Sequence, residues 1–76
     1  MKPVKVITYS GYRGEERPIA FFLNEERIEV LAILDKRIEE SYADRKRKRI
    51  FKIKGSDGYT RVLWYDEHTM EWTSGE

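Results

Sequence analysis

The clearest pattern in the sequence is an alternation of apolar and polar residues over 47–65, interrupted by GSDG at 55–58. A period of two is typical of β-strands with one buried face. Asp57-Gly58 is a strong signal for a two-residue hairpin turn, because both central positions of the favoured turn need positive φ. A four-residue loop over 55–58 would keep the same faces. We therefore predict a hairpin whose apolar face pairs Phe51 with Trp64 and Ile53 with Val62.

Two further strands are expected in the first third of the chain. Residues 4–9 (VKVITY) are rich in β-branched residues, and residues 19–23 (IAFFL) form an apolar run of strand length. The segment between them, GYRGEERP at 11–18, contains two glycines and a proline. Glycine and proline interrupt regular structure, so this segment is expected to be a loop.

A closing strand is expected near the C-terminal end of the sequence. Residues 66–69 are predicted to form a turn, and MEWT at 70–73 then places Met70 and Trp72 on one side of a strand. Large aromatic side chains supply much of the buried area of a small core. The simplest assignment places four of them in the core, namely Phe21, Phe51, Trp64 and Trp72.

Residues 24–43 fit two different elements. A helix would have Asn24 as its N-cap and glutamates in its first turn, with apolar residues at helical spacing: Leu31, Leu34, Ile38 and Tyr42. A strand would follow a turn at 24–27 and place Ile28, Val30 and Ala32 on one face. On local evidence alone the helix is slightly favoured.

Two longer segments carry a family resemblance: RPIAFFLNEERIEVLAILDKR at 17–37 and RIFKIKGSDGYTRVLWYDEHTMEW at 49–72. They resemble a family of small uncharacterised bacterial β-domains, which occur alone or near the C-terminus of proteins that resemble Y-family DNA polymerases. Leu23 and Ile28 stand where that family usually has aromatic residues. The resemblance implies a strand over 27–34, with any helix reduced to a turn or two around 36–44. It assigns no catalytic or binding residue.

Together these patterns predict one mainly β domain over residues 1–76. We expect an antiparallel sheet of five or six short strands, strongly curled or closed into a partly open barrel, because a small core and exposed edges favour closure. The alternative is an α+β fold with one helix around 25–43.

The distribution of charge along the chain is more informative about function than the net charge. The net charge is only +1, yet residues 45–54 hold seven of the fifteen basic residues and no acid. Small β-modules bind single-stranded nucleic acid through such cations, with aromatic rings stacking on bases. The alternative is a solvated edge protected by lysine, or a basic linker paired with Glu39, Glu40 and Asp44. The candidate nucleic-acid-binding residues are Arg45, Lys46, Arg47, Lys48, Lys52, Lys54, Tyr59, Arg61 and Tyr65.

The sequence offers little for catalysis or for a cofactor. It has no cysteine and one histidine, His68, so a zinc site lacks ligands and acid–base chemistry lacks its usual groups. Adjacent glutamates along a strand point to opposite faces and do not converge in a pocket. We expect a non-enzymatic protein with no catalytic residue, cofactor or metal site.

Two functional hypotheses remain from the sequence. The first is a nucleic-acid-associated accessory module, whose partner is single-stranded nucleic acid or a protein of the DNA-repair type. The second is a protein-interaction or scaffold module, monomeric or weakly homodimeric through an edge strand. No apolar run is long enough to span a bilayer, so a cytoplasmic location without membrane contact is expected.

Overall fold

A computed structural model describes residues 2–10 and 16–75 and contains only strands and turns within them. The strands are β1 (Lys2–Pro3), β2 (Lys5–Ser10), β3 (Glu16–Leu23), β4 (Glu26–Glu40), β5 (Arg47–Gly55), β6 (Thr60–Asp66) and β7 (Glu71–Gly75). Of the loop expected at 11–18, residues 11–15 lie outside the described residues, and 16–18 belong to β3.

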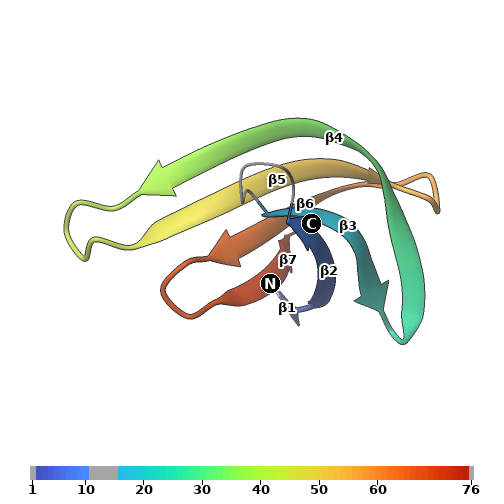
Figure 1. Cartoon of the computed structure of the whole chain (residues 1–76), viewed down its shortest axis with the longest axis horizontal. Helices are drawn as coiled ribbons and strands as arrows, with labels where there is room; N and C mark the ends of the chain where they lie inside the picture. Colours follow the sequence, from blue (N-terminus) through green and yellow to red (C-terminus); the bar gives the residue numbers. More distant parts are fainter. Residues whose placement is uncertain (1, 11–15, 76) are drawn as a thin grey trace.

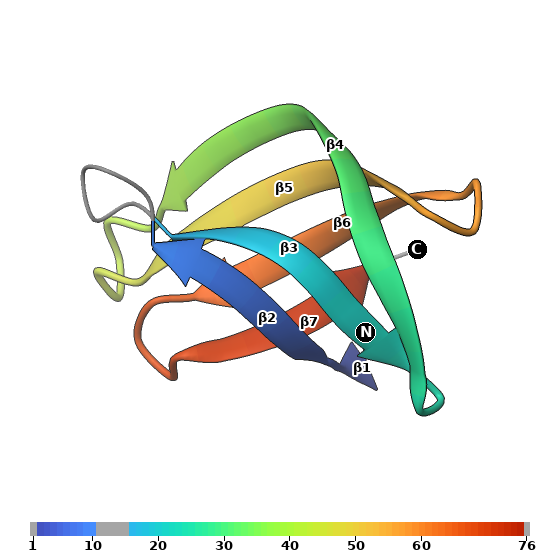
Figure 2. The ribbon, with the colours of Figure 1, turned by 45° about the vertical axis from the view of Figure 1, so that its right-hand side comes forward.

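The strands form one antiparallel sheet in the order β1-β7-β6-β5-β4-β3-β2. β1 and β2 stand at opposite ends of this order but are separated along the chain only by Val4. The Val4 N–H donates to the carbonyl of Trp72 at 3.1 Å. Counted as one, β1 and β2 make a six-strand sheet curled into a half-barrel (Figure 1, Figure 2). The predicted mainly β, curled architecture is confirmed.

The helix considered for 25–43 is wrong, because this segment forms the 15-residue strand β4 and a following turn. Asn24 and Glu25 have φ of 50° and 69°, the conformation of a tight two-residue hairpin turn between β3 and β4. The expected helical turn around 36–44 is also absent, since the strand continues to Glu40.

The helix-like spacing in β4 has a structural cause. Register irregularities with β5 occur between Val30 and Ala32 and between Ile33 and Asp35. As a result Val30, Ile33 and Lys36, three residues apart, pair with Gly55, Ile53 and Phe51, two residues apart. Leu31 and Leu34, two of the four residues at helical spacing, are the extra residues of these β-bulges, so their spacing of three arises within a strand.

The β5–β6 hairpin has a three-residue loop, not the predicted two or four. The Gly55 N–H donates to the Tyr59 carbonyl at 2.9 Å, and the Gly58 N–H donates to the Gly55 carbonyl at 3.0 Å. Gly58 has φ of 90°, which suits the left-handed last position of such a loop. An odd loop inverts the faces of the second strand.

The predicted pairing of the hairpin is therefore wrong by one residue. Phe51 pairs with Leu63 rather than Trp64, and Ile53 pairs with Arg61 rather than Val62. Leu63 is fully buried, whereas Val62 and Trp64 are only partly buried and lie on the opposite face.

One cluster of side chains forms the core inside the curled sheet. It consists of Phe21, Ile28, Phe51, Ile53 and Leu63, with Val4, Val6, Leu23, Val30 and Trp72 packed against it. The ring centroids of Phe51 and Trp72 lie 5.7 Å apart, so three of the four aromatic assignments are confirmed and Trp64 is the exception. Met70 is 73% exposed in the β6–β7 turn, not on the face of Trp72.

This register makes a prediction about stability. Leu63→Ala should lower the free energy of unfolding by about 2–5 kcal/mol, because it leaves a cavity in the core. Val62→Ala should cost less than about 1.5 kcal/mol, because its side chain is partly in solvent already. Urea denaturation of both variants measures the difference. The reverse order of effects would support the Ile53–Val62 pairing instead.

Candidate nucleic-acid interface

The predicted basic face divides between the two sides of the hairpin. Lys48, Lys52 and Lys54 pair with Asp66, Val62 and Thr60, on the side away from the core. We call these three residues the lysine row, and we call this side of β5, β6 and β7 the outer face. Arg61 and Tyr65 pair with Ile53 and Arg49 and so lie on the core side, because the odd loop moved them there.

Arg61 is engaged in holding the hairpin loop. Its Nη1 and Nη2 donate to the two carboxylate oxygens of Asp57 at 2.9 and 2.7 Å. Its guanidinium also lies 5.6 Å from the ring centroid of Phe21 and 5.3 Å from that of Tyr59. The hydrogen bond from Arg61 is the main reason that the pKa of Asp57 is below its ordinary value. Arg61 therefore joins the loop to the core.

The two candidate tyrosines differ in their surroundings. Tyr59 is 66% exposed beside the Arg61 guanidinium, and its ring remains accessible. Tyr65 is partly buried, and its ring centroid lies 5.0 Å from that of Trp72. Tyr65 thus extends the aromatic packing at the core and is not available as a free stacking surface.

Ion pairs engage much of the basic run. Arg47 pairs with Glu40 at 3.5 Å and with Glu67 at 3.2 Å, and Arg49 pairs with the same Glu67 oxygen at 3.2 Å. Lys46 lies 4.0 Å from Asp44. The exposed pairs among these contribute little stability, whereas the Arg49–Glu67 pair is partly buried. The carboxylates of these pairs nevertheless offset the positive charge of the basic run. For Glu40 and Asp44 this agrees with the predicted pairing of a basic linker with its neighbouring acids.

The lysine row differs in having no ion pair with a described residue, although carboxylates lie across from two of its members: Glu39 and Asp66 pair with Lys48, and Asp35 pairs with Lys52. Lys52 and Lys54 are exposed, Lys48 is partly buried, and none of the three forms an ion pair with a residue that the structure describes. Arg45 is exposed in the β4–β5 turn with φ of 55°, apart from the row. Of the nine candidates, the row is the set of three cations that share one face of β5.

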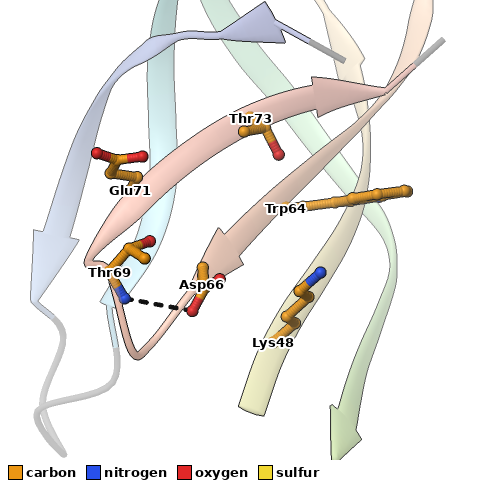
Figure 3. Close-up of a pocket in the computed structure, with 6 residues that line it drawn as sticks. All are labelled: Lys48, Trp64, Asp66, Thr69, Glu71 and Thr73. Atoms are coloured by element: carbon orange, nitrogen blue, oxygen red, sulfur yellow. Dashed lines mark hydrogen bonds between the residues drawn. The ribbon is translucent and has the colours of Figure 1, made fainter. Parts of the chain in front are cut away.

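A shallow hollow of about 230 Å³ lies beside the row on the outer face. Figure 3 shows the flat Trp64 side chain on one side of the hollow, with the Lys48 side chain next to Trp64 and Asp66 close by. The Trp64 Nε1 is buried without a hydrogen-bond partner among the described residues. The other lining residues are Thr69, Glu71 and Thr73. At this size the hollow is smaller than the roughly 300–1,000 Å³ of small-molecule sites.

Asp66 organises the turn at the edge of this hollow. Its Oδ1 accepts the backbone N–H of Thr69 at 3.3 Å (Figure 3). The same oxygen accepts the backbone N–H of His68 at 2.8 Å. The His68 N–H is the main cause that lowers the pKa of Asp66, and Lys48 adds a smaller effect. His68 takes part through its backbone, and its side chain is exposed in the predicted turn.

Sequence reasoning missed two contributors to this surface. The sequence predicts Trp64 in the core because GSDG also fits loops of two or four residues, and those loops would place Trp64 on the face of Phe51. Glu67 was not considered as a partner of Arg47 and Arg49, because that contact joins β5 to the turn after β6.

Comparison of the chain with protein-family models, with curated proteins and with solved structures gives no match. The resemblance to small bacterial β-domains stays a prediction. In the part of the chain that the structure describes, no three His, Asp or Glu side chains are grouped to hold a metal ion. No described helix could cross a membrane.

The contact between Asp57 and Arg61 gives a prediction about the pH dependence of stability. Because the folded-state pKa of Asp57 is lowered, its ionisation stabilises the fold above the ordinary pKa of about 3.9. That contribution is lost as the pH falls through the lowered value. Arg61→Gln should raise the pKa of Asp57 and leave Asp66 as the internal control, as measured by carboxyl carbon NMR. An Asp57 pKa that is unchanged by Arg61→Gln would contradict the assigned cause.

Proposed function

We propose that this chain is a small non-enzymatic module that binds single-stranded nucleic acid on its outer face. The observation that carries the proposal is the lysine row, three cations on one face of β5 that no described carboxylate holds in an ion pair. The proposal narrows the nine candidate residues to Lys48, Lys52 and Lys54 for phosphate contact.

The row suits a backbone better than a single anion. Alternate residues of a strand are about 7 Å apart, so Lys52 and Lys54 are neighbours and Lys48 lies about 14 Å from Lys52 along β5. Such a line of charge follows a polymer and recognises no particular base.

Trp64 supplies the aromatic surface beside the row. It is partly buried on the strand next to β5, and its side chain borders the hollow that Lys48 also lines. A base stacked on an aromatic ring in such sites contributes roughly 1–3 kcal/mol and tolerates any sequence. Asp66 and Glu71 line the same hollow and repel further phosphates there. The three lysines therefore set an upper limit of about three phosphate contacts.

The proposal predicts a shallow salt dependence. The logarithm of the binding constant for a single strand falls by roughly 0.7 per phosphate contact with the logarithm of salt concentration, so three contacts give a slope of about −2. Lys52→Gln with Lys54→Gln should reduce the slope to about −0.7. Fluorescence anisotropy with a labelled oligothymidine, over a series of salt concentrations, measures both slopes.

A matched control is available on other strands. Lys5→Gln with Arg27→Gln also removes two positive charges, but from β2 and the start of β4. This double variant should leave the slope near −2. Trp64→Ala should weaken binding by roughly five- to a hundredfold at fixed salt without changing the slope. Absence of binding at low salt, or equal losses in both double variants, would reject this surface as the interface.

A further inference from the structure

The second half of β4 has an open edge. β3 pairs with β4 only at Glu26–Glu29, and β5 pairs with it from Val30 to Glu40. Within residues 2–10 and 16–75, no strand pairs with the other edge of β4 beyond Glu29. Figure 1 shows this half of β4 arching along the outside of the sheet with β5 on one side.

This edge carries apolar side chains in water. Leu31 is 64% exposed, Leu34 52%, Ile38 47% and Ile33 37%, and Tyr42 just beyond the strand is 94% exposed. Proteins usually shorten, charge or cover an edge strand to prevent pairing. This edge has charged residues and two β-bulges, yet its exposed leucine and isoleucine side chains also indicate a contact with another chain.

The backbone of residues 36–40 is oriented for pairing. The Arg47 carbonyl accepts the Glu67 N–H, so it points toward β6 and away from β4. The paired residues Glu40 and Arg47 are therefore not hydrogen-bonded to each other. The N–H and C=O of Glu40 therefore point to the open edge. The register is regular from Asp35 to Glu40, so Lys36 and Ile38 also point outward by alternation.

The charges of this segment are complementary to themselves. The sequence is KRIEE, with two cations before Ile38 and two anions after it. We propose that β4 pairs antiparallel with β4 of a second copy, with Ile38 opposite Ile38 on a two-fold axis. This register places Arg37 opposite Glu39 and Lys36 opposite Glu40, each pair occurring twice.

Neighbouring registers are unfavourable. A two-fold axis normal to the sheet leaves each side chain on the same face of the sheet in both copies. Residues that face each other must share a face, so their numbers differ by an even number, and one residue lies on the axis opposite its own copy. Centring the pair on Lys36, Arg37, Glu39 or Glu40 puts a like charge on the axis, which is destabilising. Centring it on Ile38 puts an apolar pair on the axis and carries exposed Leu34 toward exposed Tyr42 of the other copy.

The contact is short, so the dimer is expected to depend on concentration. It uses the edge of β4 and not the lysine row, and so it is independent of the proposed function. Sedimentation between about 10 μM and about 1 mM should show a mass rising toward twice the 9.1 kDa of the chain. A chain that stays monomeric over this range would overturn the proposal.

Disulfide trapping tests the register, because the chain has no cysteine of its own. Residues opposite each other in a hydrogen-bonded pair have Cα atoms about 5.5 Å apart, within disulfide range. Ile38→Cys should therefore give a covalent dimer under mild oxidation. Arg37→Cys and Glu39→Cys are the controls. In this register each of these residues is offset by two positions from its own copy in the other chain, so the two Cα atoms are roughly 8 Å apart, beyond disulfide range. Equal trapping at all three positions would overturn this register.

A charge exchange tests the pairing without cysteine. Arg37→Glu alone and Glu39→Arg alone each place like charges opposite, and each should raise the dimer dissociation constant about tenfold or more. Mixing the two variants restores opposite charges in a heterodimer, so the mixture should associate as the unmodified chain does. Variants that dimerise as well alone as mixed would show that another surface is used. Circular dichroism of each variant confirms that the fold is retained.

Discussion

The number of residues in the β5–β6 loop determines which side chains enter the core. Three residues, 56–58, connect the strands, and Gly58 takes the left-handed φ of 90° that closes the loop. Arg61 clamps Asp57 within it, and the Ser56 N–H donates to the Glu29 carbonyl at 2.8 Å, which fixes the loop to β4. One residue more or less would turn Leu63 out of the core and Trp64 into it.

The same inversion shapes the candidate interface. It leaves Lys48, Lys52 and Lys54 on the outer face with Trp64, and it moves Arg61 to the core side. A run of basic residues that looks continuous in sequence thus becomes two groups. Arg47 and Arg49 are held by Glu67, which comes from the turn after β6, while the lysine row stays without an ion pair to any described residue.

Much of the fold was predictable because its signals are local. The alternation over 47–65 and the turn at 66–69 both indicate strands and turns without reference to the rest of the chain. The face of Trp64 was not predictable, because GSDG fits loops of two, three or four residues. The conformation of β4 was ambiguous, because its apolar residues recur at helical spacing. Leu31 and Leu34 owe that spacing to β-bulges against β5, which depend on a distant strand.

The register of the β5–β6 hairpin can be measured directly by NMR. Pairs that are not hydrogen-bonded bring their Cα atoms within about 4.5 Å, so nuclear Overhauser effects join their Hα protons. A three-residue loop predicts these effects between Ile50 and Trp64 and between Lys52 and Val62. Hα contacts of Phe51 with Trp64, or of Ile53 with Val62, would contradict the three-residue loop and the assignment of faces that follows from it.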